Sequence, residues 1–251
     1  GDRIIIMTIK NTMKKAIRVL MLLPCILLPL TVLANAGAHL DKAPIDASNH
    51  DSLQRGARTF INNCLNCHSA NYMRYNRLLE IGLTEKQIKD NLLFSGEKVG
   101  DTMKVAINPV DAKKWFGVAP PDLSVEVRAR GADWVYSYMR SFYRDDTSAT
   151  GWSNCVFDPV TCKVSMPHVL YELQGEQQLN HETHELKLVK PGRLSVEEYD
   201  VLVGDLTNFM AYMAEPAKQQ RNHLGWFVLL FLSVLLVLTY KLKKAYWKDI
   251  H

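Results

Sequence analysis

Cysteine is scarce in this chain, with five among 251 residues, and its distribution argues against a common kind of metal site. Cys64 and Cys67 form a C-x-x-C pair, but no second C-x-x-C pair follows, whereas a structural zinc site usually takes its ligands from two such pairs. A thioredoxin-like pair is also disfavoured, because it opens a helix after a buried strand and the residues before Cys64 have helical spacing instead.

Positive charge is sparse in the central part of the chain. Residues 1–36 carry five Lys and Arg against one Asp, and residues 224–251 carry four against one, but residues 37–223 carry 21 against 24 Asp and Glu. A nucleic-acid-binding domain has positive charge clustered on its folded part. The distribution therefore argues against a nucleic-acid partner and fits a chain that meets a membrane at both ends.

The first 36 residues have the layout of a secretory signal. Met13 opens a basic segment, an apolar stretch continues to Leu33, and small residues precede Gly37 as a cleavage site. Two prolines interrupt the apolar stretch, which is short, so a retained membrane helix is disfavoured. We expect residues 1–36 to be removed and residues 37–223 to fold outside the cytoplasm, where thiols oxidise.

Residues 224–240 predict a membrane anchor. They carry no charge and are apolar on every helical face, although 17 residues is at the short end for a span. Trp226 and Tyr240 supply interfacial aromatics, and four lysines follow in residues 241–251 as a positive-inside flank. We expect that tail to lie in the cytoplasm. The alternative is a buried core helix of a soluble protein.

The segment CLNCH has the C-x-x-C-H spacing of covalent haem attachment. In that arrangement Cys64 and Cys67 form thioethers to the porphyrin, and His68 lies beneath the iron as its proximal ligand. Two anchors one helical turn apart fix the ring, and the next residue then points at the metal. The motif follows a short amphipathic helix in a chain that we expect to be exported. The pattern therefore predicts one covalently attached haem c.

An electron carrier of this kind takes a sixth iron ligand, commonly Met or His. The candidates are Met73, Met103, Met139, Met166, Met210, Met213, His168, His181 and His184. Most of these are explained equally well as ordinary core or surface residues. Met166 differs because it lies in an irregular segment directly before Pro167, which stiffens the chain. His168 is its rival, and spacing alone leaves both possible.

Cys155 and Cys162 close a short loop that ends four residues before Met166. In an oxidising compartment we expect them to form a disulfide, with a stabilisation of about 2.5 kcal/mol from loop entropy. Our hypothesis is that the bridge holds the ligand segment against the haem face. The alternative is a staple with no bearing on the iron.

The coarse pattern is helical, with helices expected at about 51–63, 84–93, 132–143 and 195–214. Ser195 and Glu198 form a capping box for the last of these, and Pro216 marks its end. Residues 96–131 and 144–192 are rich in turn residues and read as long loops, which are uncommon in a compact domain unless they wrap around something. A haem would serve as that core.

Longer segments resemble the cytochrome c1 family of bacteria. They are CLNCHSANYMRYNRL, GVAPPDLSVEVRARGADWVYSYMRSFY, MPHVLYELQG and LTNFMAYMAEPAKQQRNHLGWF, and the resemblance covers residues 37–251. It implies a mainly α fold: a cytochrome c-like haem domain with long loops and one carboxy-terminal transmembrane helix.

The resemblance also implies roles for single residues. It gives thioether links at Cys64 and Cys67 and axial ligation by His68 and Met166, in preference to His168. Pro120 and Pro121 match the haem-edge loop, Arg128 a residue near one haem propionate, and Tyr136 a second propionate partner. Related chains often lack the Cys155 and Cys162 pair or place it differently, so the resemblance does not assign this pair a role.

The implied function is one-electron transfer in the quinol–cytochrome c reductase, the cytochrome bc1 complex. This subunit would take electrons from the Rieske iron-sulfur protein and pass them to cytochrome c, while cytochrome b holds the quinol chemistry and this chain makes no bonds itself. It would sit in the bacterial inner membrane as a single-span protein of a dimeric complex, with its haem domain in the periplasm. Two alternatives are a membrane-anchored c-type cytochrome of another oxidase or dehydrogenase, and a non-haem ectodomain.

Overall fold

The computed structural model describes residues 40–180 and 182–248, so the expected signal at 1–36 lies outside the described residues. The larger helices are α2 (His50–Thr59), α3 (Glu85–Asn91), α4 (Pro109–Phe116), α6 (Ala132–Arg140), α8 (Val196–Ala214) and α9 (Lys218–Tyr246). Shorter helical pieces are the π-helix η1 (Phe60–Cys64), the 3-10 helix η2 (Tyr75–Ile81), α5 (Glu126–Arg130) and α7 (Tyr171–Gln174). The described chain is mainly helical, as predicted.

Helix α2 confirms the expected helix before the C-x-x-C-H segment. The side-chain oxygen of Asn49 caps it by accepting a hydrogen bond from the Ser52 N–H at 3.0 Å. The last turn widens into η1, where the Leu65 N–H donates to the Phe60 carbonyl at 3.0 Å. This π-helical turn carries the helix one residue beyond its predicted end at 63 and places Cys64 at its terminus.

Helix α8 begins and ends where its sequence signals place it. The Ser195 side chain accepts from the Glu198 N–H, and the Glu198 carboxylate accepts from the Ser195 N–H at 2.8 Å, which completes the capping box. The helix ends at Ala214, since Pro216 excludes the helical conformation at the residue before it.

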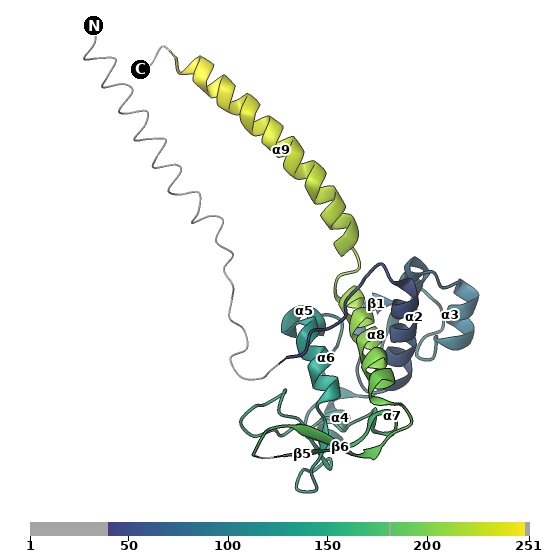
Figure 1. Cartoon of the computed structure of the whole chain (residues 1–251). Helices are drawn as coiled ribbons and strands as arrows, with labels where there is room; N and C mark the ends of the chain where they lie inside the picture. Colours follow the sequence, from purple (N-terminus) through teal and green to yellow (C-terminus); the bar gives the residue numbers. More distant parts are fainter. Residues whose placement is uncertain (1–39, 181, 249–251) are drawn as a thin grey trace. The chain divides into compact units, whose positions relative to one another are not determined.

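The core of the domain is built around α8, which packs against α2 on one side and against α5 and α6 on the other (Figure 1). Gly56 makes the close approach of α2 possible, since a Cβ there would lie 2.0 Å from the Asp205 carbonyl oxygen. Arg55 adds a forked ion pair across the same contact, with its Nε 2.6 Å from Asp205 Oδ2.

Helix α6 is shorter than the predicted 132–143 and ends at Arg140. Tertiary contacts explain the difference, because the side-chain amides of Gln174 and Gln177 donate to the Arg140 carbonyl, and Gln177 donates also to the Phe142 carbonyl. Tyr143 then begins a strand. The amphipathic pattern continues past Arg140, so local sequence could not reveal this end.

The segments expected to be long loops are wrong in part, because they contain secondary structure. Residues 96–131 hold α4 and α5, and residues 144–192 hold α7 and a hairpin. The described strands form three two-stranded antiparallel sheets: β1 (Ala70–Arg74) with β2 (Thr102–Met103), β3 (Tyr143–Arg144) with β4 (Trp152–Ser153), and β5 (Gly175–Leu179) with β6 (Leu186–Pro191). These strands are short and rich in polar residues, which weakens the alternation that marks a strand.

Helix α9 contains the predicted anchor at 224–240 and is longer, running from Lys218 to Tyr246. It is the one helix in the described part of the chain that is long and apolar enough to cross a membrane, and none of its residues is buried in the protein. A helix that is apolar all round and packs on nothing is compatible with a lipid environment.

Candidate functional site

A cavity of about 570 Å³, counting its open mouth, brings six of the predicted site residues together. Three segments line it, contributed by residues 63–68, 116–121 and 165–169. The lining residues are Asn63, Cys64, Cys67, His68, Phe116, Val118, Pro120, Pro121, Ser165, Met166, Pro167 and Val169. Mostly apolar walls with a few polar or ligating groups are typical of a cofactor site.

The first wall of the cavity, residues 63–68, is called the His68 wall. The turn after η1 is tight, since the Cys64 carbonyl accepts from the Cys67 N–H at 3.1 Å and from the His68 N–H at 2.9 Å. Both thiols are free, and neither is joined to another cysteine. Burial raises the pKa of the Cys64 thiol to about 12, so this sulfur stays protonated at neutral pH. The motif thus presents two thiols and an imidazole to one cavity.

The His68 ring is oriented by a hydrogen bond from its Nδ1 to the Pro121 carbonyl, 2.8 Å away. A carbonyl only accepts, so Nδ1 carries the proton and Nε2 keeps its lone pair. Burial lowers the pKa of His68, although this bond and the nearby acidic residues oppose the shift. The imidazole is therefore held in the neutral tautomer that a metal ligand needs.

The loop that supplies this carbonyl is fixed to the chain next to His68. Asp122 accepts hydrogen bonds from the Asn71 backbone N–H at 2.8 Å and from the Asn71 side chain at 2.7 Å. The Leu123 N–H donates to the Ser69 carbonyl at 2.8 Å. These bonds tie the Pro120 and Pro121 segment to the residues that follow the motif.

A second wall of the cavity, residues 165–169, is called the Met166 wall. Met166 is half-buried, packs against the hydrophobic core, and accepts a hydrogen bond at its Sδ from the Tyr138 hydroxyl at 3.5 Å. Tyr138 lies on α6 and was not predicted as a site residue. The sequence signal that could have pointed to it is its position four residues after Trp134, which puts the two aromatic rings on one face of a helix. Aromatic residues at this spacing are also common in an ordinary hydrophobic core.

His168, the rival ligand, lies outside the lining of the cavity. Its ring is 2 % exposed and stacks on Phe142 at 4.7 Å between centroids, with Trp152 edge-on at 5.0 Å. Burial lowers the pKa of His168 to about 4, so the ring is neutral. The geometry favours Met166 as the group that faces the cavity from this wall.

Cys155 and Cys162 are joined by a disulfide in the structure. Asn154, which is fully buried, links this loop to α6: its N–H donates to the Cys162 carbonyl at 2.8 Å, and its side chain donates to the Tyr138 carbonyl at 2.7 Å. The bridge therefore closes a loop that is bonded to the residue whose hydroxyl contacts Met166.

Arg128 and Tyr136 do not line the cavity. The Arg128 side chain is 66 % exposed, and its nearest carboxylate oxygen belongs to Glu215 at 4.0 Å. Tyr136 is buried on α6, with the Arg140 guanidinium 4.6 Å from its ring centre. The geometry of the cavity gives no support to the two propionate roles that the resemblance implies, and both stay predictions.

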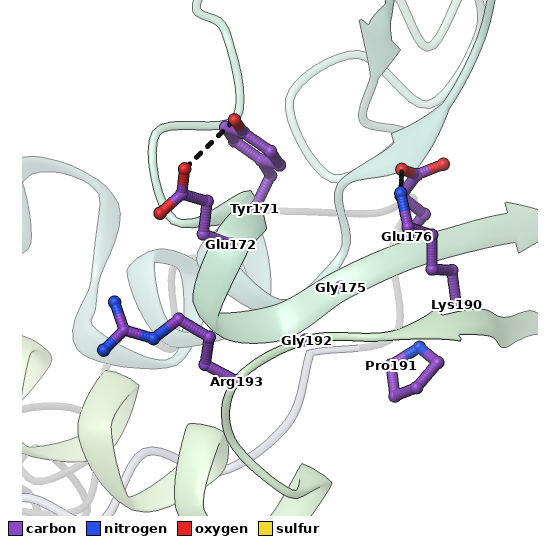
Figure 2. A pocket seen from close by; sticks show the side chains of 8 residues that line it. All are labelled: Tyr171, Glu172, Gly175, Glu176, Lys190, Pro191, Gly192 and Arg193. Carbon is purple, nitrogen blue, oxygen red and sulfur yellow. Dashed lines mark hydrogen bonds and ion pairs between the residues drawn. The ribbon is translucent and has the colours of Figure 1, made fainter.

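A second hollow, of about 680 Å³, lies where α7 meets the β5–β6 hairpin (Figure 2). Two polar contacts lie along it: Lys190 Nζ is 2.7 Å from Glu176 Oε1, and the Tyr171 hydroxyl donates to Glu172 at 3.3 Å. It contains none of the predicted site residues. Although it is the larger hollow, it lacks ligating sulfur and imidazole, so the cavity between the two walls is the candidate site.

The residues of that cavity fit a covalently held haem. Two free thiols and a ring nitrogen with an available lone pair come from one wall, and a thioether comes from the other. Within residues 40–180 and 182–248, no group of three or more His, Cys, Asp and Glu side chains is arranged to hold a metal ion.

Comparison with known proteins agrees with this chemistry. The model of the cytochrome C1 family matches residues 40–250. The chain belongs to the cytochrome c1 family. It is 48% identical to cytochrome c1 of Allochromatium vinosum over 90% of this chain and 96% of that protein, and 26% identical to cytochrome c1 of Rhodospirillum rubrum over 79% and 81%. It is also 53% identical to a Nitrosomonas europaea protein named ammonia monooxygenase gamma subunit, over 84% of this chain and 89% of that protein.

Membership of the cytochrome c1 family implies a haem cofactor and a role in respiratory electron transport, as a subunit of a cytochrome bc1 complex. The long apolar helix α9 is compatible with a single-pass anchor of a bacterial cytochrome c1. The recognition of the family from four sequence segments is confirmed.

Proposed function

We propose that this member of the cytochrome c1 family takes single electrons from a Rieske iron-sulfur protein and passes them to cytochrome c, within a dimeric quinol–cytochrome c reductase whose cytochrome b carries out the quinol chemistry. The observation that carries the proposal is the meeting of Cys64, Cys67, His68 and Met166 in one cavity. When bound there, haem supplies reversible one-electron exchange at its iron.

The chain's own residues would hold one haem c by four bonds. Cys64 and Cys67 would form the two thioethers, and His68 would bind the iron through Nε2, since its Nδ1 donates to Pro121. Met166 would bind from the opposite wall. With His68 and Met166 both holding the iron, no position would remain for a substrate, so the subunit would carry electrons and make no bonds.

The cavity walls would shield the site while leaving an edge for partners. Proline, aliphatic and aromatic side chains make up most of the lining, and Phe116 and Val118 within it are 39 % and 49 % exposed. An exposed apolar rim next to a shielded centre suits brief docking of an electron donor or acceptor. Pro120 and Pro121 form the haem-edge loop in this arrangement.

The anchor would keep the haem domain at the membrane surface. We propose that α9 crosses the bacterial inner membrane once, with the haem domain in the periplasm and the basic tail from residue 241 in the cytoplasm. The lysines that follow the apolar residues support this orientation through the positive-inside rule.

A second candidate function rests on the similarity to the Nitrosomonas protein. Its name assigns it to an ammonia monooxygenase, and the identity of 53% is substantial. On this alternative, the same haem domain and anchor would serve as the c-type cytochrome subunit of another oxidase or a dehydrogenase. The two candidates differ in the proteins with which the chain assembles.

Mild detergent extraction of the membrane followed by affinity purification of the full chain tests the proposal. We expect pyridine haemochrome spectra to show one haem c per polypeptide, and cytochrome b and a Rieske protein to co-purify. A colourless polypeptide would overturn the haem assignment. A coloured one that brings down oxidase or dehydrogenase subunits would instead support the second candidate.

A further inference from the structure

We propose that Tyr138 is a positioning residue for Met166, and that its hydroxyl raises the reduction potential of the iron by hydrogen bonding to the ligand sulfur. This inference rests on the proposed function, specifically on Met166 as the sixth ligand. Its direct observation is the contact of 3.5 Å between the Tyr138 hydroxyl and Met166 Sδ. Sulfur is a weak acceptor, and its hydrogen bonds are longer than those to oxygen.

The Tyr138 ring is held by aromatic contacts with Trp134, one turn earlier on α6, and with Phe142, two residues beyond the end of that helix. Trp134 lies parallel to it, with centroids 4.9 Å apart and planes at 8°, and Phe142 meets it edge-on at 5.0 Å. Phe157, from the disulfide loop, contacts it at 6.3 Å between centroids. Tyr138 is 8 % exposed, so its hydroxyl has little access to water. A rigid ring therefore aims a buried donor at the sulfur.

The backbone at Tyr138 is held as firmly as the ring. Its carbonyl accepts the hydrogen bond from the side chain of Asn154, and Asn154 in turn bonds to the Cys162 carbonyl. The donor thus belongs to the same bonded unit as the disulfide loop, which ends just before the Met166 segment. Aromatic contacts of the ring and hydrogen bonds of the backbone thus both hold the Tyr138 hydroxyl near the sulfur. Without this acceptor the buried hydroxyl would lack a hydrogen-bond partner, which would lower the stability of the fold.

A thioether sulfur has two lone pairs, so one can bind iron while the other accepts a hydrogen bond. The donor withdraws electron density from the sulfur and weakens its donation to the iron. Ferric iron depends on that donation more than ferrous iron does, so the hydrogen bond favours the reduced state. The same bond resists rotation of the side chain away from the metal.

The test compares Tyr138→Phe with Tyr199→Phe in the full-length, haem-loaded protein. Tyr138→Phe keeps the stacked ring and removes only the hydroxyl. Tyr199→Phe is the matched control, since Tyr199 is 2 % exposed and its hydroxyl also donates to α6, but to the Met139 carbonyl at 2.8 Å and not to Met166.

In a redox titration followed in the visible spectrum, the ratio of oxidised to reduced protein at a given potential should be about threefold higher in Tyr138→Phe than in the wild type. This corresponds to a midpoint potential about 28 mV lower, at 59 mV per tenfold for one electron. The fraction of reduced protein that binds carbon monoxide should rise in the same variant. Tyr199→Phe should match the wild type in both measurements. An unchanged potential in Tyr138→Phe, or equal shifts in the two variants, would overturn the inference.

A double-mutant cycle separates the hydrogen bond from other effects of the hydroxyl. In a Met166→Leu background no sulfur remains, so Tyr138→Phe should leave the potential unchanged. An equal shift in both backgrounds would show that the hydroxyl acts without Met166. Failure of the proposed function looks different: the wild type would lack covalent haem, or its reduced form would already bind carbon monoxide fully.

Discussion

The His68 wall is assembled from residues close in sequence, whereas the Met166 wall depends on a side chain 28 positions away. Cys64, Cys67 and His68 are brought together by one helix end and one tight turn. Met166 lies in an irregular segment with no helix of its own, and α6 and the disulfide loop hold it in place. One wall is defined by local backbone geometry and the other by tertiary contacts.

This difference predicts how the two walls respond to change. A substitution that disturbs the packing of the helices should displace both walls, and loss of one proposed iron ligand should impair only the wall that carries it. Loss of a supporting contact should displace the Met166 wall more than the His68 wall.

The largest effect is expected from Gly56→Ala in α2. The added Cβ would lie 2.0 Å from the Asp205 carbonyl oxygen, so α2 has to move away from α8, and the helix end that carries Cys64 moves with it. We expect a loss of about 3 kcal/mol or more in the free energy of unfolding, measured by chemical denaturation. Gly100→Ala is the control, because nothing lies within 4 Å of its added Cβ. Equal stability of the two variants would contradict close packing of α2 on α8.

Replacing the two proposed iron ligands one at a time should have different effects, because each ligand belongs to a different wall. In His68→Ala we expect the yield of coloured protein to fall sharply, because the variant loses the proposed iron ligand next to the two proposed attachment cysteines. In Met166→Leu the colour should remain, but the reduced form should bind carbon monoxide, since the proposed sixth ligand of the iron would be lost. Haemochrome content and carbon monoxide difference spectra measure both. If Met166→Leu bound no carbon monoxide, another side chain would be the sixth ligand.

The two walls also differ in how far sequence alone could predict them. C-x-x-C-H identified the His68 wall because its spacing is set within one turn of chain. Spacing left Met166 and His168 both possible, and the family resemblance was needed to prefer Met166. What separates them in the structure is burial of the His168 ring between Phe142 and Trp152, a contact between distant segments.

The same limit explains the fold. The capping box of α8 is local, and the helix begins where it predicts. The end of α6 is set by Gln174 and Gln177, side chains more than 30 positions away, and was predicted three residues too late. Tyr138 was passed over for the same reason, because only the folded chain brings its hydroxyl to Met166.

A moderate effect, confined to the Met166 wall, is expected from removal of the disulfide by Cys155→Ser with Cys162→Ser. Loop entropy predicts a loss of up to about 2.5 kcal/mol. Because Asn154 connects this loop to Tyr138, carbon monoxide binding to the reduced form should also increase, while the covalently held colour should not change. The single variant Val160→Ser is the control, since Val160 is 91 % exposed in the same loop. Lower stability with unchanged carbon monoxide binding would make the bridge a staple without influence on the iron.

The smallest effect is expected from Ser195→Ala, which removes the N-cap of α8 and with it the bond from the Glu198 N–H. The cap stabilises the helix by about 1 kcal/mol, so the unfolding midpoint should fall slightly, and Ser195→Thr should restore it. Helix α8 packs on both α2 and α6, so it supports both walls alike. The potential and the carbon monoxide response should therefore stay at wild-type values. If Ser195→Ala increased carbon monoxide binding as the disulfide variant is expected to do, the position of the Met166 wall would depend on overall stability. It would then not depend on the contacts made by Tyr138 and Asn154.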